Sequence, residues 1–271
     1  MAGTLTVAST RGQLPSAPVI PIRDDNPTGR TAVVTVLLIA LNLGIYFAVQ
    51  PSADDAGENA RFSYEMAAIP CEVTTGEPLS IDEIQDPSAE RCERGDASPQ
   101  PFPDKSVWLA VLASMFFHGG LLHLGGNMLY LWIFGNNIED HLGRVRYVAF
   151  YLIAGVAATA AHVFLQPDST IPLVGASGAI AGVMGAYLVW FPNVRVLTAI
   201  PVFIIFFRPI AAKWLLGFWF VSQFFINPNA GVAWAAHVGG FVFGVVVALA
   251  IKAMRPARRV AVRSTYVDDW R

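Results

Sequence analysis

The feature that most limits the fold of this chain is a series of apolar segments without charged side chains, each long enough to cross or nearly cross a membrane. The first, Thr31–Gln50, runs for twenty residues without a charge, and about twenty apolar residues span the hydrocarbon core of a bilayer as a helix. Charged residues make up only 14% of the 271-residue chain, against roughly 25% in soluble domains. The pattern favours an all-α polytopic membrane protein over a globular enzyme with one large core.

Six of these segments are expected to form a six-transmembrane-helix bundle. They comprise residues 31–50, 121–138, 147–165, 177–191, 210–226 and 232–252. The apolar run 107–117 is short for a crossing and is better explained as a membrane-surface or re-entrant piece. A further apolar run at 196–207 is interrupted by Pro201 and is a candidate for a seventh crossing.

The distribution of basic residues decides between six and seven crossings. Outside the long loop at 51–106 they lie in the N-terminal tail, after the second span, after the fourth span and in the C-terminal tail, whereas the loops 166–176 and 227–231 contain none. Six spans place every basic cluster on one side, and the positive-inside rule assigns that side and both termini to the cytoplasm. A seventh span would move Lys252 and the basic C-terminal tail outside, so we reject it.

The segment 51–106 differs in composition from the rest of the chain. It holds thirteen acidic and four basic residues together with both cysteines, Cys71 and Cys92. We interpret it as an extracytoplasmic loop, inserted into a membrane domain at 30–254, with too few apolar residues to bury much core. An oxidising compartment favours a Cys71–Cys92 disulfide over two free thiols. The flanking segments are a mostly disordered cytoplasmic N-terminal tail and a cytoplasmic C-terminal tail, at 1–29 and 255–271.

Two of the expected helices carry a stripe of small residues. Ser177 stands between Gly175 and Gly178 at the start of the fourth span. His237 lies in the sixth span, on the same side as Gly240 and Gly244. Small residues let membrane helices approach at backbone distance. The pattern therefore predicts contact between a serine-bearing helix and a histidine-bearing helix.

The topology brings four polar residues to the outer third of the membrane. His123 and Asn127 lie four positions apart on one face of the second span, and Ser177 and His237 come from two other spans. Polar groups at this depth are a functional-site hypothesis by default. A histidine base activates a serine, and an oxyanion needs preorganised donors such as His123, Asn127 and the Ser177 backbone N–H. No acidic residue lies near His237 at this depth, so we expect a dyad rather than a triad.

Each of these residues also has a structural explanation. Ser177 could cap its helix, His237 could be a buried histidine bonded to a carbonyl, and Asn127 could join two helices. The combination supports a catalytic site more strongly than any residue does alone.

The remaining histidines and the acidic pair after the second span are given no catalytic role. His118 is expected to be structural or interfacial, and His141 and His162 lie at span ends. Glu139 and Asp140 fall on the cytoplasmic side, where we expect them to brace the next turn with Arg144 and Arg146.

Four separated motifs resemble the rhomboid intramembrane serine protease family in its six-span bacterial form. They are His118-x4-His123-x3-Asn127, Phe134-Gly-Asn-Asn-Ile-Glu-Asp140, Gly175-Ala-Ser177-Gly178 and Ala236-His237-x-Gly-Gly240-x3-Gly244, within about residues 107–254. The resemblance implies that Ser177 is the nucleophile and His237 the general base and acid. It implies that His123 and Asn127 stabilise the oxyanion. It also implies transmembrane substrates cut near their outer end, without a metal or organic cofactor.

The sequence departs from the family in two places. Some members carry an aromatic residue four positions after the serine, where it packs on the catalytic histidine, but here that position is Ala181. Support for His237 must come from elsewhere. The segment 51–106 also lacks the Trp-Arg pair found in the first loop of some bacterial members.

The resulting hypothesis is an integral protein of the plasma (inner) membrane that acts as a serine endopeptidase from the extracytoplasmic side, on transmembrane proteins within the lipid bilayer. A non-catalytic binder with the same fold and a small transporter are the alternatives. The intact dyad argues against the first, and the absence of a charged midplane residue argues against the second. A zinc protease is excluded by the lack of an HExxH motif, and no basic patch points to nucleic acid. The oligomeric state, the substrate and the scissile bond stay open.

Overall fold

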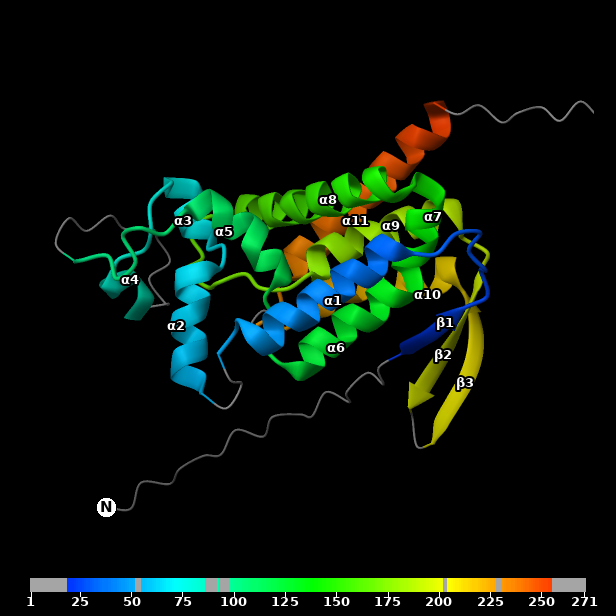
Figure 1. Ribbon diagram of the computed structural model, residues 1–271, viewed down its shortest axis with the longest axis horizontal. Helices are drawn as coiled ribbons and strands as arrows, with labels where there is room; N and C mark the ends of the chain where they lie inside the picture. The colour runs from blue at the N-terminus through cyan, green and yellow to red at the C-terminus, as the bar shows by residue number, and fades with distance from the viewer. Residues whose placement is uncertain are drawn as a thin grey trace, which may run out of the picture.

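A computed structural model describes residues 19–51, 55–85, 92, 98–201, 204–227 and 231–254 of the protein (Figure 1). It is mostly helical, with α1 (Val33–Ala48), α2 (Ala56–Met66), α3 (Pro70–Thr75), α4 (Ile81–Gln85), α5 (Val107–Ala113), α6 (Leu121–Tyr130), α7 (Asn136–Leu142), α8 (Arg144–Leu165), α9 (Ser177–Trp190), α10 (Ala212–Ser222) and α11 (Trp234–Met254). Short 3-10 turns follow α5 and α10, at Ser114–Phe116 and Gln223–Phe225, and a π-helical turn at Leu131–Gly135 joins α6 to α7. The expectations for residues 1–18 and 255–271 fall outside the described residues.

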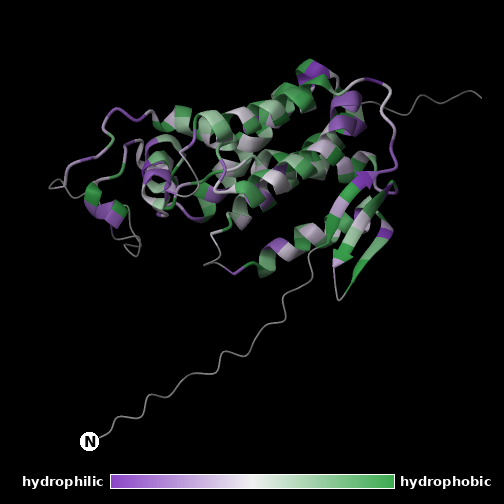
Figure 2. Cartoon of the chain, turned by 60° about the horizontal axis from the view of Figure 1, so that its bottom comes forward, coloured by the Kyte–Doolittle hydropathy of each residue, from purple (hydrophilic) through white to green (hydrophobic). Residues whose placement is uncertain are grey.

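All six segments predicted as spans are helical over most of their length. In the described part of the chain, α8 and α11 are long and apolar enough to cross a membrane. The pair Val107–Phe116 and Leu121–Leu142 bends by 79° and makes a third crossing if it is counted as one span, while α1 and α9 are apolar but shorter. Hydrophilic residues gather in the insertion and at the bundle ends (Figure 2). The protein is thus a helical membrane protein, and its six crossings remain a prediction.

Helices α8, α9 and α11 pack against one another in the centre of the bundle. Every residue of α9 from Gly178 to Tyr187 is buried. A methyl group at Gly240 would overlap the carbonyl oxygen of Gly178, and one at Gly244 would overlap that of Gly182. The two stripes of small residues therefore meet, and their contact fixes the spacing between α9 and α11.

A three-stranded antiparallel sheet lies at the end of the bundle opposite to α2, α3 and α4 (Figure 1). Its strands, in spatial order, are β1 (Ile20–Asp24), β2 (Arg195–Pro201) and β3 (Ile205–Ala211). The all-α prediction is therefore wrong for this part, and so is the expectation of disorder at residues 20–24. The run 196–207, the candidate for a seventh crossing, contains Pro201, which interrupts a helix, and it is rich in β-branched and aromatic residues that favour strands. Because β3 extends to Ala211, α10 begins after the predicted start of the fifth span.

The acidic pair at the end of the second predicted span has different partners from those expected. Both Glu139 and Asp140 accept hydrogen bonds from the N-terminal part of the chain instead of bracing a turn with Arg144 and Arg146. Glu139 Oε2 accepts from the backbone N–H of Thr35 at 2.8 Å and from its hydroxyl at 2.9 Å. Asp140 Oδ2 accepts from the backbone N–H of Gly29 at 2.8 Å. A helix N-terminus has unpaired N–H groups and a positive dipole end, which explains why Glu139 binds there.

The insertion at 51–106 folds into a small unit built from α2, α3 and α4. Ile69, Cys71 and Leu79 form its buried core, which is small, as the sparse apolar content predicts. A disulfide joins Cys71 to Cys92, with their Cα atoms 5.7 Å apart.

This unit is hydrogen-bonded to the loop 166–176, which leads into α9. The backbone N–H of Leu173 donates to the carbonyl of Ala68 at 2.7 Å, as an isolated antiparallel bridge. The backbone N–H of Cys71 donates to the carbonyl of Ser169 at 3.0 Å. The insertion therefore supports the loop that precedes Ser177.

A buried ion pair holds the base of the insertion together. Lys105 Nζ lies 2.6 Å from Glu72 Oε2, and each side chain is only 2% exposed. Lys105 also donates to the carbonyl of Tyr64 at 2.6 Å, and Glu72 accepts from the N–H of Leu79 at 3.1 Å. Burial raises the pKa of Glu72 and lowers the pKa of Lys105, because each group loses water, and the attraction between them acts in the opposite direction.

Replacing Lys105 with methionine is expected to destabilise the insertion by about 3 kcal/mol, because the substitution leaves the Glu72 carboxylate buried without its cation. The double variant Glu72→Gln/Lys105→Met is expected to recover most of the loss, because neither buried charge remains. Hydrogen exchange of the amides in α2 and α3 measures both effects in the purified protein. Exchange in Lys105→Met that matches the unmodified protein would show that the pair contributes nothing.

Candidate active site

Ser177 is the first residue of α9 and follows the loop 166–176. The chain reaches it through Gly175, whose φ of 125° lies in a region that favours glycine. A Cβ atom at Gly175 would lie 2.8 Å from Cε1 and Nε2 of the His123 ring. Glycine at this position therefore allows the backbone turn into α9 and the close approach of His123 to the same loop.

His237 projects from the second turn of α11 toward Ser177. Its Nε2 lies 2.8 Å from the Ser177 hydroxyl oxygen, within the distance of a good hydrogen bond. The structure therefore brings together the serine and the histidine that the sequence singled out, across the contact between the two stripes of small residues.

Gln223 completes a chain of hydrogen bonds that the sequence analysis missed. Its Oε1 lies 2.8 Å from Nδ1 of His237, and its Nε2 donates to the Trp219 carbonyl at 2.9 Å. A carboxamide oxygen only accepts, so Nδ1 carries the proton and Nε2 is left as an acceptor for the Ser177 hydroxyl. The site thus has a neutral third member in place of the acidic residue whose absence led us to expect a dyad.

Trp219 supplies the aromatic contact that Ala181 cannot make. Its ring centroid lies 5.8 Å from that of His237, with 37° between the planes. Trp219 and Gln223 are four positions apart on α10 and the turn that follows it. One face of this segment therefore orients the imidazole by packing and by a hydrogen bond.

His123 and Asn127 project from α6 toward the same cavity. Nδ1 of His123 accepts from the backbone N–H of Gly119 at 3.3 Å, which leaves Nε2 of the neutral ring to carry the proton, beside Gly175. Nδ2 of Asn127 is buried without a hydrogen-bond partner in the described structure. An unpaired buried donor costs about 1–3 kcal/mol, so this amide is positioned to donate to a group that the protein itself does not supply.

These side chains line a cavity of about 750 Å³. Its walls combine α6, the start of α9, Trp219 of α10, the start of α11 and the loop from Gln166 to Val174. His162, to which we assigned no chemistry, also lines it. None of the described residues in the wall is acidic, which agrees with a histidine held by a neutral amide. The cavity is large enough for several residues of an extended peptide.

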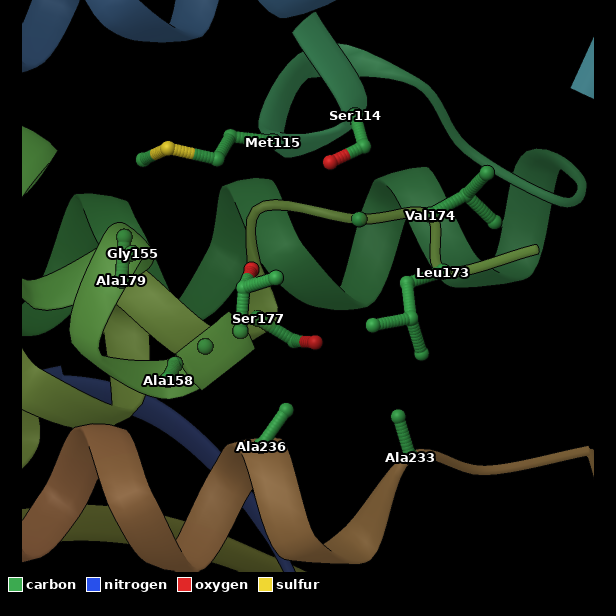
Figure 3. Close-up of a pocket in the computed structure, with 13 residues that line it drawn as sticks. Ser114, Met115, Gly155, Ala158, Leu173, Val174, Ser177, Ala179, Ala233 and Ala236 are labelled. Atoms are coloured by element: carbon green, nitrogen blue, oxygen red, sulfur yellow. The ribbon is translucent and has the colours of Figure 1, made fainter. Parts of the chain in front are cut away.

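A second, smaller cavity of about 30 Å³ lies on the other side of Ser177. Ser114 and Met115 border it on one side, and Ala233, just before α11, and Ala236 of α11 border it on the other (Figure 3). This volume accommodates one water molecule.

The other site residues and potential metal ligands lie as follows. His118 is buried and packs edge-to-face on His123, with ring centroids 5.2 Å apart. Gly178, Gly240 and Gly244 lie in the contact between α9 and α11, and Cys71 and Cys92 lie in the insertion. Within the described ranges, no three His, Cys, Asp or Glu side chains come together as a metal site.

Comparison with known proteins gives consistent matches over the membrane-embedded part. Residues 105–253, more than half of the chain, match the Rhomboid domain family. The chain is 34% identical over 149 residues to presenilin-associated rhomboid-like protein A, mitochondrial, of Danio rerio. It is 31% identical over 150 residues to rhomboid protease GluP of Bacillus subtilis, and 28% identical over 167 residues to rhomboid protease AarA of Providencia stuartii.

These three matches cover 52%, 53% and 57% of this chain but only 37%, 26% and 59% of the respective relatives. The chain therefore spans less than two thirds of the length of each of them.

Proposed function

The chain belongs to the rhomboid family, and we propose that it is an intramembrane serine endopeptidase that cleaves transmembrane segments of other membrane proteins near their extracytoplasmic end. The observation that carries this proposal is the hydrogen-bonded series Ser177–His237–Gln223 at the wall of a large cavity, with distances of 2.8 Å for both links.

In the proposed reaction, Nε2 of His237 takes the proton of the Ser177 hydroxyl as its oxygen attacks the scissile carbonyl. The carbonyl oxygen becomes an oxyanion, which accepts hydrogen bonds from His123 Nε2–H, Asn127 Nδ2–H and the backbone N–H of Ser177. The C–N bond then breaks, and the protonated His237 gives its proton to the departing amine. This leaves an ester between Ser177 and the N-terminal part of the substrate.

Water completes the proposed cycle. His237 removes a proton from a water molecule that attacks the ester carbonyl, and the proton then returns to the Ser177 oxygen as the carboxylic acid leaves. The small cavity beside Ser177 has room for one water, which would keep water available behind a bound substrate.

Membrane location and orientation are part of the proposal. We propose an integral plasma (inner) membrane protein with six spans, both termini in the cytoplasm and the cavity open to the extracytoplasmic side. The domain boundaries 1–29, 30–254 and 255–271 belong to the same scheme. Fractionation and protease protection of each tail test it. One of the three relatives, that of Danio rerio, carries the word mitochondrial in its name.

Labelling of Ser177 tests catalysis independently of any substrate. A fluorophosphonate reacts with a serine only when a base activates it, so the purified protein in lipid is expected to be labelled at Ser177, as located by mass spectrometry. His237→Ala is expected to abolish labelling. Failure of the unmodified, folded protein to react would favour the alternative of a non-catalytic binder of membrane proteins.

Gln223→Met is expected to lower kcat about tenfold or more while KM stays nearly unchanged, because loss of an orienting hydrogen bond to the base affects only the reacting state. Gln223→Glu keeps an acceptor oxygen at the same place and is expected to restore much of kcat. We assign Gln223 as a positioning residue, since it acts through His237. Equal loss in both variants would indicate a packing role and contradict the assignment.

Substrates with small or helix-weakening residues near the outer membrane face are expected to be cleaved faster than matched substrates with an unbroken leucine helix there. Amides within a helix are hydrogen-bonded and covered, so the segment must unwind before its carbonyl meets Ser177. Cleavage rates of two single-span substrates that differ only at these positions measure the preference. Equal rates would contradict it.

A further inference from the structure

The β2–β3 hairpin has an apolar end that no described part of the protein covers. It extends away from the helices at the end of the bundle opposite to the insertion (Figure 1). Four consecutive residues at the start of β3 and just before it are exposed, namely Ile204, Ile205, Phe206 and Phe207 at 66%, 60%, 44% and 59%. Exposed apolar groups of this size mark an interaction surface.

The inner part of the same sheet is packed normally. Val196 and Thr198 of β2 are fully buried, and Pro21 of β1 is buried beside them. Phe206 pairs with Ile200 and Phe207 with Ala199, farther from the bundle. The apolar end is therefore an extension beyond the core, in a hairpin whose base is fixed to the bundle.

The exposed charged side chains of the β2–β3 hairpin itself, Arg195 and Arg208, are both positive. The neighbouring strand β1 carries the exposed Arg23. It ends at Asp24, whose carboxylate accepts hydrogen bonds from Asn137 and Tyr187, and the exposed Asp25 follows it. The sequence contains no acidic residue from Ser169 to Val267. A hairpin with exposed aromatic side chains and exposed arginines is complementary to anionic phospholipid headgroups above acyl chains.

The start of α10 continues this arrangement. Lys213 and Trp214 follow β3 directly and are exposed, with Lys213 Nζ 5.7 Å from the centroid of the Trp214 ring. Tryptophan and lysine are typical of the level where the headgroups meet the hydrocarbon. The hairpin thus leaves the bundle at the depth at which such residues anchor a membrane helix.

We propose that the β2–β3 hairpin is a lipid-binding element, which lies in the headgroup layer of the bilayer at the basic end of the protein. Phe206, Phe207 and their apolar neighbours enter the upper acyl chains, while Arg195 and Arg208 bind the phosphates of anionic lipids. The hairpin cannot go deeper, because β3 is an outer strand of the sheet in the described structure, and its unpaired backbone groups need water or headgroups. This inference is independent of the proposed protease activity.

A fluorescent label at Ile205→Cys tests the depth of the hairpin in the full-length protein. Cys71 and Cys92 are joined to each other, so under non-reducing conditions only the new cysteine reacts. The label is an environment-sensitive nitrobenzoxadiazole, and the vesicles contain lipids brominated near the top of the acyl chain. Leu249→Cys, exposed on α11, serves as the hydrocarbon reference, and Glu58→Cys in the insertion serves as the aqueous reference.

We expect bromolipid to quench the label at position 205 strongly, with blue-shifted emission, and to leave the label at position 58 unaffected. Adding phosphatidylglycerol to phosphatidylcholine vesicles is expected to increase quenching, and Arg195→Gln/Arg208→Gln is expected to reduce it by roughly twofold in the anionic vesicles. Thermal unfolding of each variant serves as a check that it is folded.

Two results would overturn the membrane location of the hairpin, and a third would overturn its binding of anionic lipids. Emission at position 205 that matches position 58 would place the hairpin in water. The label could instead show blue-shifted emission without bromolipid quenching, and lose the blue shift when the protein is diluted in the bilayer. That result would assign the surface to a second copy of this chain, paired through the edge of β3. Quenching that is the same in neutral and anionic vesicles would overturn the role of the arginines.

Discussion

Ser177→Ala is expected to abolish cleavage of a single-span substrate, and His237→Ala is expected to lower kcat/KM by about 10⁴-fold or more. In the proposed mechanism the serine supplies the attacking oxygen, and the histidine, 2.8 Å away, is the only base in hydrogen-bond contact with it in the described structure. Because the two act as one unit, the double variant is expected to be no slower than the slower single variant. The measurement is cleavage by the purified protein in liposomes, with folding checked for each variant.

Matched controls exist on the same chain. Ser63→Ala removes a serine in the insertion, and His141→Ala removes a histidine that stacks on Trp190 at the far end of the bundle. Both are expected to cleave like the unmodified protein. Equal cleavage by Ser177→Ala would reveal a contaminating protease, and absence of cleavage by the unmodified protein with several substrates would favour the binder.

Asn127→Leu is expected to reduce kcat by about 10²–10³-fold with little change in KM, which is the usual effect of losing one oxyanion donor. The structure adds an expectation that separates catalysis from packing. Nδ2 of Asn127 is buried without a partner in the described structure, so an apolar side chain of similar size removes a desolvation cost. The variant is therefore expected to unfold at the same temperature as the unmodified protein or higher.

Thermal unfolding and steady-state kinetics of the same Asn127→Leu preparation check both parts. If Asn127 joined helices, its loss would lower stability and leave the kcat of the folded fraction intact, which is the opposite pattern. His123→Leu provides a second donor variant, and its effect with Asn127→Leu is expected to be less than multiplicative, because both act on one oxygen atom.

Ser177 and His237 could be found from the sequence because the glycines that permit a close helix contact lie in the same short motifs as the two reactive side chains. Gly178, Gly240 and the residues around them permit a close helix contact, and only one serine and one histidine lie at its outer end. The length of the apolar runs without charges likewise identified the segments that make up most of α1, α6, α8, α9, α10 and α11. Their number of membrane crossings depends on tilt and bending, which the residue pattern does not encode.

Gln223 was missed because it stands within an apolar run that was treated as a featureless span. The principle applied to His123 and Asn127, that a polar group inside a span is a functional hypothesis, would have identified it. Which polar atom meets His237 depends on the orientation of α10 relative to α11. That orientation results from tertiary packing and has no signal in a single sequence.

The sheet and the insertion show two other limits of the sequence analysis. Charge distribution correctly argued against a seventh helix at 196–207, but it could not reveal that the run pairs with residues 20–24, because strand pairing is non-local. In the insertion, the low apolar content correctly predicted a small core, but it did not reveal what else stabilises the unit. A disulfide and the buried pair Glu72–Lys105 supplement the core.

Two hydrogen bonds, in which the Ala68 carbonyl accepts and the Cys71 N–H donates, join the insertion to the loop 166–176, about a hundred residues away in sequence. The loop that forms one wall of the cavity beside Ser177 is thus attached to the hydrophilic insertion. Antibodies, which neither enter the bilayer nor reach a narrow intramembrane cavity, can bind that insertion. An antibody fragment that distorts the segment between Ala68 and Cys71 would change the shape of the cavity through the loop 166–176. Such a fragment would inhibit the protein without contacting the proposed catalytic residues.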